Sequence, residues 1–356
     1  MPIYINGLSS ITPQNTFENN AFLDQIIDHN QLFLEIQKPE YKNFINPKLL
    51  RRMSKIIRMG VTTGMAALKE AGVENPDAII TGTGLGCIED TEKFLNALLE
   101  NNEQLLTPTS FILSTHNTVS AQIAVMLGCN NYNYTYVHSA VSFENSLVDA
   151  IMHFQEGQMH NILVGGIDEI TQENYDTKVY SGIWKKEASS ILNLFDYQTQ
   201  GCIPGESATF AVLSNIENNN SYGQLIDVHT FFEGDLSIVE TELETFLKIQ
   251  NIALKDIDVL LAGINGDAHY DQMYYDLHES KLSHTALVSF KNVCGENDSS
   301  SAFAFWVAAK IAKHQNIPEF ISIKDSNKTS FRYILIYHYN FIHRNNHAFS
   351  LIRALF

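Results

Sequence analysis

The feature that most constrains the fold is an order of predicted strands and helices that occurs twice along the chain. The first series runs from a helix at 51–72 to a strand at 207–214, and the second begins with a strand at 224–231. Apolar residues at helical spacing mark the helices, and short apolar runs mark the strands. Such alternation favours an α/β fold, and its repetition indicates an internal duplication. We therefore predict two α/β halves, 1–215 and 223–356.

The individual elements are assigned from the same patterns, with Gly72 as the C-terminal stop of the first long helix. The predicted helices are 51–72, 94–99, 117–127, 143–154, 238–250 and 298–314. The predicted strands are 77–83, 131–137, 161–166, 207–214, 224–231, 258–264, 286–290, 320–323 and 333–339. The segment that begins at Phe341 is polar and then apolar, and it receives no assignment.

The charge of the chain excludes one class of partner. Its 23 basic and 40 acidic residues give a net charge of −17. Nucleic-acid binding requires a basic surface, so we expect no nucleic-acid partner. An acidic partner protein would also be repelled, except at one local basic cluster. That cluster comprises Lys48, Arg51, Arg52, Lys55 and Arg58.

The sequence predicts neither a membrane span nor a metal centre. No run approaches the ~20 continuous apolar residues that a span needs, and no basic segment leads an apolar run at the N-terminus, so we expect a cytoplasmic protein. The four cysteines have no paired spacing and are expected to be reduced thiols. Asp267, His269 and Asp271 are metal-ligand types without a metal-site spacing. We predict no metal and no cofactor.

Several segments, in order, match the motifs of one family. These are Arg51-Arg-Met-Ser, Gly82-Thr-Gly-Leu-Gly86, Phe195-Asp196 followed by Gly201 and Gly205-Glu206-Ser-Ala208, and Lys291-Asn-Val-Cys-Gly295. The chain thus resembles the beta-ketoacyl-ACP synthases of the thiolase-like fold. The resemblance implies two duplicated halves in a five-layer α-β-α-β-α arrangement. The chain is shorter than typical members, with the losses between 166 and 195 and between 214 and 258.

The resemblance also implies that the catalytic residues of the family are missing. Its nucleophilic cysteine sits in a sharp turn at the start of a helix, and the matching position is Ala140, whose methyl group cannot hold a thioester. The first catalytic histidine falls on Asn265 and the second on Glu296, whereas the lysine is retained as Lys291. The late glycine turn that shapes the oxyanion hole is matched to 327–332, which contains no glycine.

Other residues could supply a nucleophile in place of the missing cysteine. Ser139 would need an adjacent base, and its neighbour His138 is the candidate. Neighbours on a strand point to opposite faces, so we favour structural roles for both. Cys202 and Cys294 lie near matched motifs but away from the nucleophile turn, and we expect small buried thiols.

A condensing-enzyme body without its catalytic residues corresponds to the chain-length factor, the inactive half of a ketosynthase heterodimer. We predict that the chain pairs with an active beta-ketoacyl-ACP synthase, reaches an acyl carrier protein through that complex, and shapes the acyl tunnel. The product would be of the polyketide, polyene or fatty-acid type, and aryl-polyene systems are the nearest resemblance. Two alternatives stay open, namely an active acyl-transfer enzyme that uses Ser139 and a scaffold that binds acyl-ACP.

The resemblance places the contacts of this pairing in two segments. Members dimerise across the strand before the nucleophile turn, here 131–137 with Tyr134 and Tyr136. A loop that enters the floor of the partner's tunnel corresponds to 108–112, which contains Ser110, Phe111 and Ile112. Phe111 is either a ruler of product length or a core residue.

Overall fold

The computed structural model describes residues 1–17, 22–187, 189–196, 199–339 and 345–356. Its main sheet has the strand order β11-β10-β9-β12-β13-β8-β1-β7-β5-β3-β4, and β2 pairs with β6 separately. The strands are β1 (Ile3–Ile11), β2 (Asn30–Gln31), β3 (Ala78–Gly82), β4 (Tyr132–Tyr136), β5 (Asn161–Asp168), β6 (Ser189–Ser190), β7 (Ser207–Ser214), β8 (Gln224–Phe232), β9 (Val259–Ala262), β10 (Ala286–Ser289), β11 (Ser322–Lys324), β12 (Tyr333–Tyr339) and β13 (Asn346–Arg353). The α-helices are α1 (Pro47–Leu50), α2 (Lys55–Ala71), α3 (Ile88–Glu100), α4 (Pro108–Leu113), α5 (Thr118–Leu127), α6 (Ser142–Glu156), α7 (Gln172–Tyr180), α8 (Leu236–Ile249), α9 (Gln272–Lys281), α10 (Lys291–Cys294) and α11 (Ser301–His314).

The sheet consists of two portions with the same topology. In the first, β3 lies parallel to β4 and β5, and β7 runs antiparallel to β5 and β1. In the second, β9 lies parallel to β10 and β12, and β13 runs antiparallel to β12 and β8. Only a short pairing joins the portions, in which Ile3 and Tyr4 of β1 face Leu225 and Gln224 of β8. The strand order therefore repeats. The division into units 1–215 and 223–356 stays a prediction.

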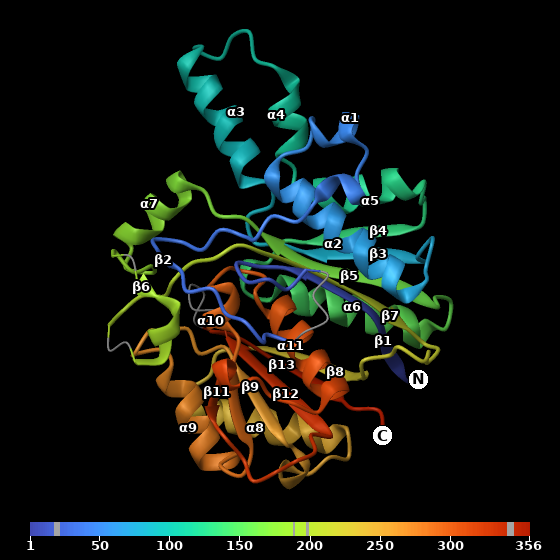
Figure 1. Cartoon of the computed structure of the whole chain (residues 1–356), viewed down its shortest axis with the longest axis vertical. Helices are drawn as coiled ribbons and strands as arrows, with labels where there is room; N and C mark the ends of the chain where they lie inside the picture. The colour runs from blue at the N-terminus through green and yellow to red at the C-terminus, as the bar shows by residue number, and fades with distance from the viewer. Residues whose placement is uncertain (18–21, 188, 197–198, 340–344) are drawn as a thin grey trace.

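Helices cover both outer faces of the two portions and fill the space between them (Figure 1). Helices α2 and α5 pack on the first portion, α8 and α9 on the second, and α6 and α11 between the two. The central helices meet at the rings of Phe143 and Phe305, whose centroids lie 5.8 Å apart. This is the α-β-α-β-α arrangement that the sequence predicts.

The central position of α11 explains its composition. Residues 301–312 of this helix are all buried, because sheets lie on two sides of it. A helix that is apolar all round belongs in a core rather than at a surface. The outer helix α2 is instead amphipathic, and it ends where Gly72 adopts a left-handed φ of 70°.

Two segments differ from the predicted elements. Residues 108–113 form helix α4 instead of the predicted loop. Strand β13 forms within the segment from Phe341 that receives no assignment, and residues 340–344 of that segment lie outside the described part of the chain. The apolar periodicity of the sequence does not predict this strand, because its polar residues His347 and Ser350 are buried. No helix in the described ranges has both the length and the apolar character to cross a membrane.

Candidate functional site

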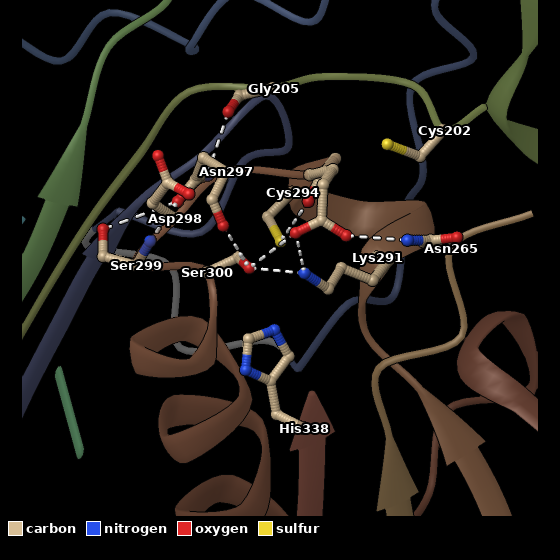
Figure 2. A network of polar contacts seen from close by, with 12 residues as sticks. Cys202, Gly205, Asn265, Lys291, Cys294, Asn297, Asp298, Ser299, Ser300 and His338 are labelled. Carbon is tan, nitrogen blue, oxygen red and sulfur yellow. Dashed lines mark hydrogen bonds and ion pairs between the residues drawn. The ribbon is translucent and has the colours of Figure 1, made fainter. Parts of the chain in front are cut away.

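The three predicted positions in the second half lie together where strands β9 and β10 end. Figure 2 labels two of them, Asn265 and Lys291. Asn265 follows β9, Lys291 begins α10, and Glu296 lies in the turn after α10. The Asn265 Nδ2 atom donates a hydrogen bond of 2.8 Å to Glu296 Oε2. The Lys291 ammonium forms an ion pair with Glu296 Oε1. All three side chains are buried.

The carboxylate of Glu296 and the ammonium of Lys291 are thus held by protein partners. Each Glu296 oxygen accepts one of the bonds described above, and the Lys291 ammonium also donates to the Ser300 hydroxyl. Ser300 in turn donates to the backbone oxygen of Asn297 at 2.8 Å. Because the two charges neutralise each other inside the core, removal of either partner would leave an uncompensated buried charge.

The backbone segment 203–205 packs against this network and is hydrogen-bonded to Glu296. The Gly205 amide donates to the backbone oxygen of Glu296 at 3.0 Å, and the Glu296 amide donates to Ile203 at 2.8 Å. A Cβ atom at Gly205 would overlap the Cys294 carbonyl, so the close approach requires glycine. The Gly205 match noted in the sequence therefore has a structural reason.

The turn matched to the nucleophile position leads directly into a helix. Ser139–Val141 forms a 3-10 turn that leads into α6, and Ser139 has a φ of 51°, which is unusual for a residue other than glycine. The His138 amide donates to Ser142 Oγ at 2.8 Å, and this hydroxyl donates to the backbone oxygen of Thr83 at 2.9 Å. Ala140 lies in this turn, and its side chain is outside the described atoms.

Among the residues that the structure describes, the Ser139 hydroxyl has no hydrogen bond to a basic side chain. Within the described part of the chain, no hydrogen bond joins the His138 ring to the Ser139 hydroxyl. A serine hydroxyl attacks a carbonyl carbon only when a base removes its proton. The reading of Ser139 as a nucleophile therefore gains no geometric support.

Cys202 and Cys294 are fully buried beside the network. Burial raises the pKa of Cys294 to about 12 and the pKa of Cys202 well above its usual range. The thiolate is the nucleophilic form of cysteine, so both side chains stay inert thiols near neutral pH. This agrees with the structural role expected from the sequence.

A buried pair that the sequence reading missed lies next to the network. Glu144 on α6 and His338 on β12 are both buried, and His338 Nδ1 lies 3.8 Å from Glu144 Oε1. Burial raises the pKa of Glu144 to about 7. Burial, followed by the charge of Lys291, holds the pKa of His338 well below its usual range. One signal was present, since Glu144 shares the apolar helix face of Leu147 and Ile151.

The segment 327–332, which the sequence comparison matched to the oxyanion-hole turn, does not lie near Asn265. Lys328 Nζ contacts Asp258 Oδ1 at 2.7 Å, and Asp258 precedes β9, whereas Asn265 follows this strand. The segment 327–332 therefore lies at the end of β9 opposite to Asn265. The connection at the correct end joins β12 to β13, and most of it lies outside the described residues.

The acidic residues near Asn265 act as loop caps. Asp271 accepts hydrogen bonds from the Asn265 and Gly266 amides, at 2.9 and 2.7 Å. Asp267 accepts from the amides of Gly201 and His269. Among the residues that the structure describes, no group of three or more His, Cys, Asp or Glu side chains is arranged to hold a metal ion.

The predicted contact strand β4 is the edge of the sheet. Tyr134 is 49% exposed on it and Tyr136 is half-buried, with ring centroids 4.9 Å apart. Tyr132 donates from its hydroxyl to Asp149 at 3.1 Å. An edge strand lined by partly exposed aromatic side chains offers both unpaired backbone groups and apolar surface.

The second predicted contact segment forms an exposed helix. On α4, Phe111 is 57% and Ile112 is 63% exposed, and Ser110 is half-buried. The Phe111 ring packs against Phe94 of α3 with centroids 5.2 Å apart. The alternative in which Phe111 is a core residue is therefore wrong for this chain. Its proposed role as a ruler stays a prediction.

Comparisons with known proteins agree with this geometry. Residues 27–195 match the family model for the beta-ketoacyl synthase N-terminal domain. The 3-oxoacyl-[acyl-carrier-protein] synthase II, chloroplastic, of Arabidopsis thaliana is 22% identical over 62% of this chain and 42% of its own length. The corresponding synthase I of Hordeum vulgare is 21% identical over 60% of this chain and 48% of its own length. The match thus spans less than half of each of these relatives.

Solved structures match over the whole chain. "The ishigamide ketosynthase/chain length factor" has a TM-score of 0.83 at 16% identity and covers 100% of this chain and 99% of that one. A beta-ketoacyl synthase from Burkholderia phymatum has a TM-score of 0.79 at 14% identity, with 100% of both chains covered. Residues 27–195 therefore resemble the beta-ketoacyl synthase N-terminal domain in sequence, and the whole chain has the thiolase-like ketosynthase fold.

Proposed function

We propose that this chain is a catalytically inactive, ketosynthase-like subunit, a chain-length factor, which pairs with an active beta-ketoacyl-ACP synthase. The observation that carries the proposal is the closed network of Asn265, Lys291 and Glu296 beside a nucleophile turn that holds Ala140. The body of the enzyme is retained, whereas the groups that condensation needs are replaced.

The electrostatics of the network oppose condensation. That reaction develops negative charge on an enolate oxygen, and ketosynthases stabilise it with hydrogen-bond donors. Here Glu296 places a carboxylate at a donor position, and its charge neutralises Lys291. An enolate oxygen beside this carboxylate would be repelled rather than stabilised. A cysteine at position 140 alone would therefore not restore condensation.

Pairing is supported by the surface of the chain. The edge strand β4 and the helix α4 expose Tyr134, Phe111 and Ile112. Exposed apolar groups beside an open sheet edge are typical of a surface that a partner covers. The resemblance to a structure titled a ketosynthase/chain length factor supports the same assignment.

The acyl carrier protein and the product class follow from similar proteins. A further match, with a TM-score of 0.75 at 14% identity over 99% of both chains, is described as a "type II PKS acyl-carrier protein in complex with its ketosynthase bound to the hexaketide". By analogy, the paired complex would receive acyl chains from a carrier protein and make a polyketide, a polyene such as an aryl polyene, or a fatty-acid-type chain.

The test is co-expression with an intact ketosynthase from the same source. We expect a 1:1 complex by native mass spectrometry that condenses acyl and malonyl units, and no condensation by this chain alone. Ala140→Cys should leave the isolated chain inactive, whereas a matching Cys→Ala change in the partner should abolish the activity of the complex. A stable acyl-enzyme on Ser139, seen by intact mass, or a partner whose activity and assembly ignore this chain, would contradict the proposal.

A further inference from the structure

A surface hollow lies between α1, the start of α2, α4 and α5, away from the Lys291 network. Its volume is about 790 Å³, which falls within the usual range for small-ligand sites. Most of its wall is aliphatic. The apolar lining residues are Leu49, Met53, Ile57, Ile112, Leu113 and Val125.

The charged residues of the hollow all have the same sign. Arg51 and Arg52 line it together with the neutral Thr109 and Gln122, and no lining residue is acidic. In a chain with a net charge of −17, this is unusual. In the described part of the chain, neither guanidinium has an ion pair or a side-chain hydrogen bond, whereas nearby Lys55 is paired with Glu206.

We propose that this hollow binds an aliphatic chain that ends in an anionic group, with the chain against the apolar wall and the head group at Arg51 and Arg52. A guanidinium binds carboxylate or phosphate oxygens through paired hydrogen bonds, and the two arginines could each form such a pair of bonds with the head group. Val125 and Ile112, which are 74% and 63% exposed, would lose contact with water on binding.

The lining also argues against other ligand classes. It contains no aromatic side chain, so a nucleobase or another planar ring would find no stacking surface. It has no carboxylate to pair with a cationic ligand. A neutral aliphatic molecule would leave both guanidiniums without a partner, so the charge of the head group should contribute to affinity.

Binding to the whole chain can be measured by displacement of a fluorescent dansyl-undecanoate probe. Dodecanoate and monododecyl phosphate should compete, and their relative affinities identify the preferred anion. Dodecanol should compete at least about tenfold more weakly. Between octanoate and dodecanoate, each added methylene should tighten binding by roughly fourfold, as burial of a methylene predicts.

Variants then locate the site. Arg51→Gln combined with Arg52→Gln should weaken dodecanoate binding by about tenfold or more and leave dodecanol unchanged. Ile112→Trp should weaken both by filling the hollow. Lys255→Gln is the matched control, because this exposed lysine lies in the other half of the chain. A melting curve of each of the three variants confirms that it folds.

Three results would overturn the proposal. The first is the absence of saturable binding by either anion. The second is equal affinity of dodecanoate for the double arginine variant and the unchanged chain. The third is complete loss of binding when a partner synthase joins the chain, since Ile112 also belongs to the predicted interface and the hollow would then be a protein contact. The first two results come from the isolated chain, so they are independent of whether the chain acts as a chain-length factor, and only the third depends on that proposed function.

Discussion

At the scale of single residues, Glu144 makes the stability of the protein depend on pH. Burial raises the pKa of this carboxyl to about 7, above roughly 4.3 for an unfolded chain. Between these values the folded state holds a proton that the unfolded state has lost. The contribution of Glu144 to stability is therefore fully present below about pH 4 and is lost as the pH rises through 7. The buried neighbours that face it are His338, Ser301 and Lys291.

The first prediction concerns Glu144→Gln. The amide keeps the shape and cannot ionise, so the variant should be more stable than the unchanged chain at pH 8, by about 4 kcal/mol at most, and the difference should shrink to about 1 kcal/mol at pH 5. Urea unfolding at both pH values measures this. Glu100→Gln, at an exposed helix end, is the control. Other buried carboxyls such as Glu169 leave part of the pH dependence in place. An identical change in the free energy of unfolding between the two pH values, in the variant and in the unchanged chain, would refute the prediction.

Sequence motifs could predict which residues meet in the site but not how they interact. Asn265, Lys291 and Glu296 follow strands whose order the sequence reveals, so their proximity could be expected. The ion pair between Glu296 and Lys291 depends on the folded core, because a charge buried there needs a partner of opposite charge. His338 was missed because one polar residue in an apolar strand gives no sign of its neighbours.

At the scale of elements, β4 should decide assembly. Tyr134 stands at the sheet edge and is 49% exposed, so its replacement changes the surface rather than the core. Tyr134→Asp would place a charge in an apolar interface and should abolish the 1:1 complex while the melting temperature of the isolated chain shifts little. Tyr180→Asp, at a position 90% exposed on α7, is the control and should leave the complex intact. Analytical ultracentrifugation distinguishes the outcomes, and an undisturbed complex with Tyr134→Asp would remove β4 from the interface.

Helix α4 allows a separate test of the ruler. Phe111 is 57% exposed, so Phe111→Ala should cost well under the ~3–5 kcal/mol typical of a core phenylalanine. In the paired complex it should lengthen the product, because a smaller side chain leaves more room for the growing chain. Leu105→Ala, at a 96% exposed position, is the control. Mass spectrometry of the products measures length, and an unchanged length would end the ruler hypothesis.

Element prediction succeeds where one physical signal dominates. Strand β7 coincides with the predicted 207–214, because it is buried along its whole length. Helix α11 begins three residues later than predicted, at Ser301, since Asp298 lies in the preceding turn. Helix α4 was not predicted because its exposed apolar residues give no amphipathic pattern. Strand β13 was hidden by the buried polar residues His347 and Ser350.

At the scale of the whole molecule, the central layer belongs to both halves. Helix α6 packs on β3 of the first portion and on β8 of the second, and α11 packs on β12 and also on β7. A polar cluster joins the halves at the surface. Tyr222 donates from its hydroxyl to Glu70 at 2.6 Å, and the Lys313 ammonium lies 4.2 Å from the centroid of its ring.

This shared layer predicts that neither half folds alone. Separation would expose the apolar face of α6 that contacts β8 in one fragment, and much of the buried, mainly apolar surface of helix α11 in the other. A fragment that leaves so much apolar surface in water loses its main driving force for folding. Fragments 1–215 and 223–356, expressed separately, should show no cooperative thermal transition and little dispersion of amide NMR signals. Co-expressed, they should associate and melt in one transition, which controls for damage by the cut. A cooperative melt of 223–356 alone would instead establish it as an independent domain, and the repeated strand order would then mark two folding units rather than one core built from a duplicated topology.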